Sequence, residues 1–168
     1  MADVNTVLDA NRAAVSELIA AAEKSGEGWL VPRAEGKWSP SQVVEHVARA
    51  LEESANVVAG APSKFPTLPS FVRPVIRTLF FKRALKNQSF PRGRTNRAFN
   101  PANGPATPQD ARARLQAAMA RFDRECRERA SSGQPVTSTI FGEVTLVDYA
   151  QFQALHTRHH CRQMPGVV

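Results

Sequence analysis

The sequence predicts an all-α protein, a helical bundle in which a long connection separates the second and third helices. Two observations favour this fold class. Four segments carry apolar residues at alternating three- and four-residue steps, the spacing of an amphipathic helix. Three of them open with Ser or Thr followed three residues later by an amide or acidic side chain, as helix N-termini do. Since an apolar helix face must be covered, we expect the four helices to pack together.

The first two helices have clear boundaries. An apolar stripe runs through residues 3–24 and predicts the first helix. The second begins after Ser39, because Pro40 suits the first helical position and Gln42 completes a capping box. Gly60 marks its end. The inner face of the second helix is expected to consist of Val43, Val47, Leu51, Ala55 and Val58.

The connection over residues 62–106 is basic and rich in proline. It is too long for a simple bundle turn, and it contains one predicted helix, over residues 69–85. No Asp or Glu occurs in residues 54–109, whereas nine Lys and Arg do. Such a block can attract an anionic ligand, nucleic acid or a membrane surface, or it can form a solvated face.

The third and fourth helices are also marked by caps. The third is predicted to begin after Thr107 and to end before Gly133. A short extended segment follows at residues 137–141. Thr145 then caps the fourth helix, with Asp148 three residues later. The buried side of the third helix is expected to consist of Ala111, Leu115, Ala118, Met119, Phe122 and Cys126.

The last helix ends in a run that holds three of the four histidines. His156 can share one helix face with His160, four residues on, or with His159, three residues on. The face through His156 and His160 continues to Tyr149 and Gln163, so we favour that pair. His159 would then lie beside the site or at the surface.

The fourth histidine, His46, lies at the edge of the inner face of the second helix. If His46 meets the pair on the last helix, three imidazoles surround one point and leave positions open, as a catalytic divalent transition metal requires. Cys126 and Cys161 are poorly placed to close a structural zinc site. The alternative is that a His-rich helix end merely complements the helix dipole.

Three further residues are candidates for catalysis, each with a structural alternative. Tyr149 can donate to a bound water, or it can belong to the core. Gln163 can hydrogen-bond a ligand histidine, or it can cap the helix end. Glu45, next to His46, can act as a base, or it can be a surface residue.

Two segments resemble one known family. Residues 38–47, WSPSQVVEHV, are similar to the W-S-x-x-x-V-x-x-H-L start of the second helix in the DinB-like (DinB/YfiT) superfamily. Residues 141–148, FGEVTLVD, followed by HTRHHCRQ at 156–163, resemble its C-terminal G-x-x-[ST]…H-x-x-H-H-x-x-Q element. The connection 62–106 matches no motif of that superfamily.

The resemblance implies a single domain over residues 1–168, an up-down-down-up four-helix bundle that often forms homodimers. It also implies one divalent metal, commonly zinc or nickel, held by His46, His156 and His160. Characterised relatives include S-transferases of low-molecular-weight thiols and a maleylpyruvate isomerase. The residues beyond the three histidines vary among members, so the resemblance names a metal site and no substrate.

The sequence therefore favours a divalent-metal-dependent transferase or hydrolase with a small-molecule substrate, and the most specific candidate is a thiol-cofactor S-transferase. The metal would activate the thiol as thiolate, and arginines of the connection would bind the carboxylates of the cofactor. The candidates are Arg73, Arg77 and Arg94. The alternative is a non-enzymatic protein that uses residues 62–106 to bind an anion, nucleic acid or a membrane surface.

The sequence argues against nucleic acid and a membrane surface as partners, and it favours a cytoplasmic location. No helix-turn-helix or RNP motif accompanies the basic block, so we do not expect nucleic acid. The basic, apolar stretch over residues 71–83 resembles an interfacial helix, but such a stripe more often belongs to a core or a dimer contact. We expect a cytoplasmic protein, because the sequence shows no signal-peptide pattern and has only two cysteines.

Overall fold

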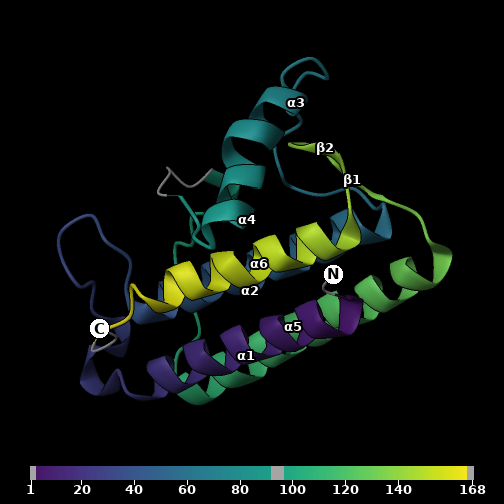
Figure 1. The fold of residues 1–168 in the computed structure, drawn as a ribbon. Helices are drawn as coiled ribbons and strands as arrows, with labels where there is room; N and C mark the ends of the chain where they lie inside the picture. The colour runs from purple at the N-terminus through teal and green to yellow at the C-terminus, as the bar shows by residue number, and fades with distance from the viewer. Residues whose placement is uncertain (1–2, 92–96, 166–168) are drawn as a thin grey trace.

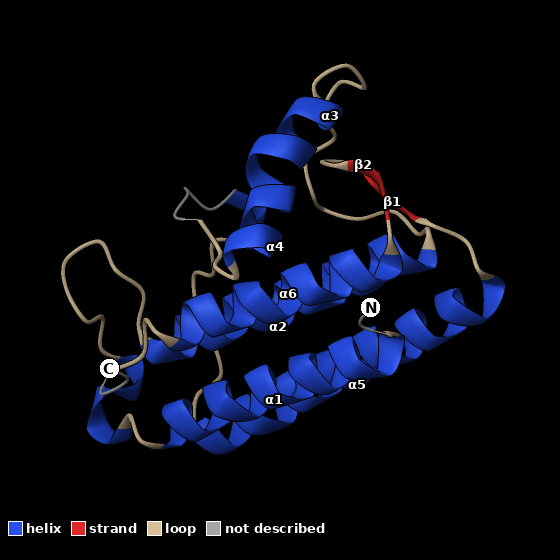
Figure 2. Ribbon diagram, viewed as in Figure 1, coloured by secondary structure: helices blue, strands red, loops and turns tan. Residues whose placement is uncertain are grey.

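The computed structural model describes residues 3–91 and 97–165. The chain is mostly helical, with one two-stranded antiparallel sheet (Figures 1 and 2). The predicted all-α class is therefore correct for the bulk of the described chain. Its long helices are α1 (Val4–Glu23), α2 (Pro40–Ala59), α5 (Pro108–Ser132) and α6 (Leu146–Cys161).

The long helices pack along their lengths (Figure 1). α1 lies against α6 and α5, and α2 lies against α5. One hydrophobic core joins all four helices, and Leu8, Leu18, Leu115 and Phe122 are fully buried in it. The side-chain amide of Asn11 donates to the carbonyl of Ala150 over 2.8 Å, which links α1 to α6.

The helix boundaries follow the predicted caps. The Ser39, Thr107 and Thr145 side chains each accept a hydrogen bond from the backbone N–H three residues on. Gln42 closes the predicted capping box on the backbone N–H of Ser39. α2 ends at Gly60, whose φ of 75° suits a residue without Cβ. The predicted buried stripe of α5 is confirmed at every position.

The crossover, residues 62–106, contains four short helical elements in its described part. The sequence predicts one helix over residues 69–85, whereas helical structure runs from residue 73 to residue 87 with a π-helical middle. It starts later because Pro74 sits in the first turn. The elements are α3 (Arg73–Ile76), η2 (Arg77–Lys82), α4 (Arg83–Asn87) and η3 (Arg97–Phe99). A further 3₁₀ segment, η1 (Gly26–Leu30), follows α1.

Phe81 anchors the crossover helix to the bundle. Its ring centroid lies 4.8 Å from that of Phe141 and 5.0 Å from that of Phe152 on α6, and its side chain is 2% exposed. The far end of the same helix projects away from the bundle (Figure 1). Three large apolar side chains at this end stay exposed: Val75 and Leu79 on the helix, and Phe71 in the turn before it.

A β-hairpin replaces the predicted single extended segment at residues 137–141. It consists of β1 (Val136–Ser138) and β2 (Gly142–Val144), with Val136 opposite Val144. β2 has only three residues, too few to show a strand pattern in the sequence, and it forms a strand only through its pairing with β1. No helix in the described ranges has the length and apolar character required to cross a membrane.

Candidate metal centre

Three histidine side chains from two helices converge at one point. His46 comes from α2, and His156 and His160 come from successive turns of α6. Nε2 of His156 lies 3.2 Å from Nε2 of His46 and 3.1 Å from Nε2 of His160. His46 and His160 are buried, and His156 is 9% exposed. All three ligand atoms lie within 4.8 Å of one another, so this group can hold a metal ion.

Hydrogen bonds on the outer side of two rings orient them. Nδ1–H of His46 donates to the carbonyl of Phe99 over 2.9 Å, and Nδ1–H of His160 donates to Oε1 of Gln163 over 3.0 Å. A carbonyl or amide oxygen only accepts, so each of these rings carries its proton on Nδ1 when neutral. The lone pair of each Nε2 therefore points toward the centre. Outer partners of this kind are typical of metal-ligating imidazoles.

The donor set fits a divalent transition metal. Nitrogens at about 2.0–2.1 Å from one ion lie roughly 3.0–3.4 Å from each other, and the two short Nε2 separations fall in this range. Without an ion, Nε2 of His156 carries at most one proton, and it can donate that proton to the lone pair of His46 or of His160 but not to both. A cation at the centre accepts the lone pairs of all three nitrogens at once, so these three histidines fit a divalent transition metal.

Burial keeps the three rings in the neutral form that binds a metal. Burial lowers the pKa of His46, and the hydrogen bond to Phe99 opposes this shift. Burial also lowers the pKa of His156 far below its usual value, with a smaller effect from the neighbouring histidines. The pKa of His160 falls to about 3, chiefly through burial. No proton therefore competes strongly for the inward lone pairs at neutral pH.

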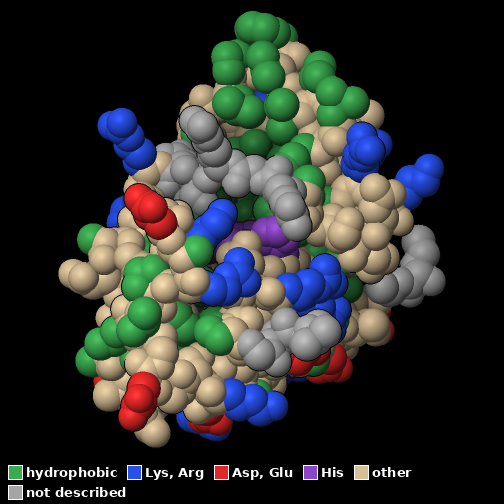
Figure 3. Space-filling model, turned by 90° about the vertical axis from the view of Figure 1, so that its left-hand side faces the viewer, with side chains coloured by type: hydrophobic (Ala, Val, Ile, Leu, Met, Phe, Trp, Pro, Cys, Tyr) green, Lys and Arg blue, Asp and Glu red, His purple; other side chains and the backbone are tan. Residues whose placement is uncertain are grey.

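The histidines form one side of a cavity of about 420 Å³. Figure 3 shows histidine side chains in a hollow, with hydrophobic side chains on one side and Lys and Arg on the other. The crossover supplies much of the remaining lining, through Phe65, Ile76, Phe80 and Phe90. A volume of this order is typical of small-molecule sites, which range from about 300 to 1,000 Å³.

Two aromatic rings flank the histidines directly. The ring centroid of Trp38 lies 4.8 Å from that of His46, and the ring of Phe90 meets His156 edge-on at 4.9 Å. Trp38 also donates from Nε1 to the side chain of Asn100 over 3.0 Å. Trp38, the residue before the Ser39 cap of α2, therefore forms part of the cavity lining.

The loop that presents the Phe99 carbonyl is held on the first turn of α2. The Gln42 side chain donates to the carbonyl of Pro101 over 3.1 Å, and the Ser41 hydroxyl donates to that of Pro105 over 2.7 Å. Gly104 packs so closely on Ser41 that a Cβ there would overlap its backbone. Sequence reasoning missed these residues, because no spacing links the loop to a helix some 60 residues earlier.

The other residues of α6 singled out from the sequence also line the cavity. Gln163 and Tyr149 both belong to its lining, as does His159. The side-chain amide of Gln163 donates to Nε2 of His159 over 3.2 Å while its oxygen accepts from His160. The Tyr149 hydroxyl is buried and donates to Oγ of Ser54 over a long 3.4 Å. Burial raises the pKa of Tyr149.

Glu45 and Arg73, the first of the candidate arginines, lie outside the lining of the cavity. Glu45 accepts from Arg49 over 2.7 Å and from Arg114 on α5 over 3.1 Å, and it does not line the cavity. Arg73 donates to the carbonyl of Leu68, again outside the lining.

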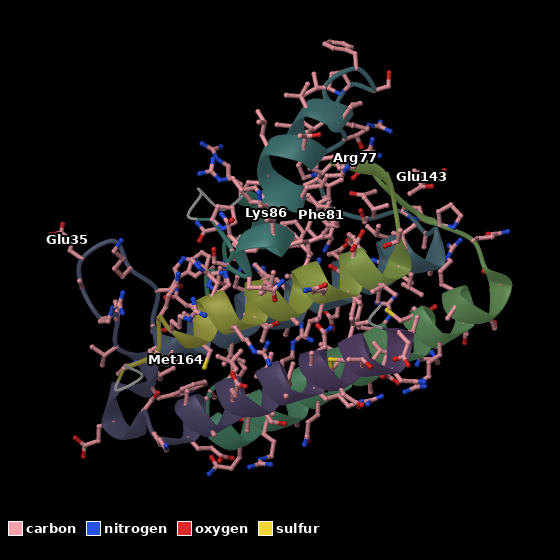
Figure 4. All side chains as sticks on the ribbon, in the orientation of Figure 1. Glu35, Arg77, Phe81, Lys86, Glu143 and Met164 are labelled. Atoms are coloured by element: carbon pink, nitrogen blue, oxygen red, sulfur yellow. The ribbon has the colours of Figure 1, made fainter. Side chains whose placement is uncertain are left out.

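Arg77 joins the crossover helix to the hairpin. Its guanidinium donates to the backbone carbonyl of Glu143 over 2.7 Å, and Figure 4 shows the two residues near each other, above Phe81. The remaining candidate, Arg94, lies outside the described residues. The roles assigned from the sequence to Glu45 and to these arginines stay predictions, and for Glu45, Arg73 and Arg77 the observed contacts are structural ones.

Comparison with known proteins gives one match. The family model described as the DinB superfamily matches residues 7–164, which include both histidine-bearing helices and the crossover. No curated protein and no solved structure matches the chain.

Proposed function

The chain belongs to the DinB superfamily, and from this premise we propose that it is a metal-dependent enzyme. His46, His156 and His160 would hold one divalent transition metal, with zinc or nickel as the expected ion. The observation that carries the proposal is the convergence of three Nε2 atoms beside a cavity of small-molecule size. Three protein nitrogens leave coordination positions open for a guest.

The residues around the site perform the supporting tasks. When bound, the metal supplies Lewis acidity and lowers the pKa of a coordinated thiol or water. Phe99 and Gln163 hold the rings of His46 and His160 in the ligating tautomer. The aromatic walls exclude water from the guest, which strengthens polar interactions at the site.

The reaction we propose is transfer of a low-molecular-weight thiol to a small-molecule substrate. A soft thiolate is a good ligand for zinc or nickel, and the open side of the histidine group faces the cavity. The thiol would lose its proton to solvent water and attack an electrophilic carbon through sulfur, forming a C–S bond as the leaving group departs as an anion with the electron pair of the broken bond.

The finer architecture is part of the same proposal. We take residues 1–168 as one domain with the up-down-down-up arrangement, in which the α1–α6 and α2–α5 contacts join neighbouring helices. We also propose that the protein forms a homodimer and that it is located in the cytoplasm. The free thiols of Cys126 and Cys161, both buried, agree with a reducing compartment.

Metal analysis of protein purified without a metal-affinity column tests the site. We expect one equivalent of zinc or nickel in the wild type and a large loss in His160→Ala. His159→Ala is the matched control, because it removes the adjacent imidazole of the same helix and should retain the metal. Equal metal content in all three proteins would contradict the assignment of ligands.

A thiol-conjugation assay tests the reaction. Metal-loaded protein is supplied with low-molecular-weight thiols and an aryl halide electrophile, and thiol consumption is followed. We expect turnover in the wild type and in Gln151→Ala, a change on α6 outside the cavity lining, and none above background in His160→Ala. Turnover that survives in His160→Ala, or that is absent from every metal-loaded protein, would count against a thiol transferase.

A further inference from the structure

The cavity beside the histidines has a chemically divided lining. His159 and Gln163 add their polar groups at the end where the three candidate ligands meet. The rest of the lining is mostly aromatic and aliphatic, with Phe65, Phe80 and Phe90 from the crossover. A guest that reaches the histidines with one donor atom therefore places the rest of its body against apolar rings.

Charged side chains are missing from this lining over residues 3–91 and 97–165. Glu45 is paired with Arg114, and Arg77 donates to the backbone of the hairpin. The Lys and Arg side chains seen beside the hollow in Figure 3 lie outside the lining. Among these described residues none offers a counter-ion to an ionised group carried into the cavity, and an ionised group that loses its water without one is strongly disfavoured.

The aromatic wall has a geometry that suits another ring. The centroid of Phe90 lies 5.0 Å from that of Phe152 and 5.5 Å from that of Phe80, with tilted or edge-on planes. Phe80 in turn meets Phe152 at 5.9 Å. Rings arranged in this way present both edges and faces, and aromatic pairs prefer such edge-to-face or offset contacts.

We infer that this site takes a neutral molecule with an aromatic body and one donor atom directed at the metal. The inference rests on the proposed function, because the donor atom needs a metal held by the three histidines. It narrows the substrate class: the body of the guest carries no ionised group, and the ring packs against Phe80, Phe90 and Phe152.

Two matched probes test this inference without any turnover. Protein loaded with one equivalent of Co²⁺ is titrated with benzyl mercaptan or with 4-(mercaptomethyl)benzoate, which differ only by a carboxylate. Binding is read from the thiolate-to-cobalt charge-transfer absorption. We expect benzyl mercaptan to bind at least roughly tenfold more tightly, because its ring needs no counter-ion.

Variants of the wall identify where the ring packs. Phe80→Ala should weaken the binding of benzyl mercaptan by about tenfold, because the contact between the two rings is lost. Phe71→Ala is the matched control, because Phe71 belongs to the same connection, is 79% exposed and does not line the cavity. Ile76→Lys adds a cation to the lining and should shift the preference toward the benzoate probe. Thermal melts show that each variant is folded.

The outcomes separate the two proposals. A wild-type protein that binds no cobalt overturns the proposed function. Cobalt uptake with equal affinity for both probes, or with no charge-transfer band for either, overturns only the inference of a neutral aromatic guest. Equal losses of affinity for benzyl mercaptan in Phe80→Ala and Phe71→Ala would also overturn only the inference of a neutral aromatic guest.

Discussion

At the scale of single residues, the candidate site depends on what holds the outer nitrogens of the rings. A free imidazole shifts its proton between two nitrogens, whereas the Phe99 carbonyl and the Gln163 side chain each fix it on Nδ1. The sequence offered Gln163 either as a partner of a ligand histidine or as a cap of the helix end, and its side chain accepts from His160. It did not predict Phe99, whose contribution is a backbone atom.

Replacing Gln163 with Leu should weaken metal binding without removing a ligand. The change deletes the acceptor for Nδ1–H of His160 and frees the ring to turn, so we expect the affinity to fall by about 10- to 100-fold. Competition with a chromogenic chelator measures it. Gln151→Leu, on α6 but outside the lining, is the control, and an equal affinity in both variants would show that Gln163 does not orient His160.

Cys126 should make the free energy of unfolding depend on pH in the alkaline range. Burial raises the pKa of this thiol to about 12, with smaller contributions from the nearby Asp123 and Glu125 carboxylates. The folded pKa lies above the unfolded value of 9.0, so the stabilisation is complete below pH 9.0 and is lost as pH rises toward 12. Denaturant unfolding at several pH values should show a decline of at most about 1.4 kcal/mol per pH unit from this group.

A Cys126→Ala variant provides the comparison. It removes the titrating thiol, so its free energy of unfolding should decline less steeply above pH 9.0 than that of the wild type, whatever the difference at neutral pH. Parallel profiles for the two proteins would show that the thiol does not contribute.

At the scale of elements, the first turn of α2 does more than begin a helix. Ser41 and Gln42 hold the loop that leads from Phe99 to Pro105, and that loop supplies the carbonyl that accepts from Nδ1–H of His46. Helix boundaries could be predicted because caps and apolar stripes are local properties of the chain. The loop contacts could not, since they join segments that only the complete fold brings together.

Gly104→Ala should disturb this arrangement. The new Cβ would overlap the backbone oxygen of Ser41, so the loop must move away from α2. We expect a loss of about 1–3 kcal/mol in the free energy of unfolding, as overpacking typically causes. The metal affinity should fall as well, because the Phe99 carbonyl moves with the loop.

The control for this prediction is Gly28→Ala. Gly28 lies in η1 with no heavy atom close to where its Cβ would be, so the melting temperature and the metal affinity should change little. A Gly104→Ala protein that matches Gly28→Ala in both measurements would disprove the role of the close contact.

At the scale of the whole molecule, the candidate site joins segments from opposite parts of the chain. His46 and His156 are separated by 110 residues, and much of the remaining cavity lining belongs to the crossover between α2 and α5. The spacing on α6 favoured the pair His156 and His160, but only the absence of other histidines joined His46 to them until the family resemblance implied all three as ligands. The basic composition of the crossover gave no sign that its phenylalanines would line a cavity.

Metal removal should lower the stability of the entire fold, because the proposed ligands connect α2 to α6. A metal at 100 times its dissociation constant adds about 2.7 kcal/mol to the free energy of unfolding. We expect the thermal midpoint to rise with one equivalent of metal and to fall on chelation. His46→Phe should show no such response, and a metal-dependent midpoint in that variant would place the ion elsewhere.

The position of Trp38 gives the protein an intrinsic optical reporter. Its indole lies against the ring of His46, and the sequence contains only one other tryptophan, Trp29. A paramagnetic ion such as Cu²⁺ at the histidines would therefore quench the emission of Trp38 at short range. Occupancy can then be followed by fluorescence in dilute solution, with Trp38→Phe as the blank that reports Trp29 alone.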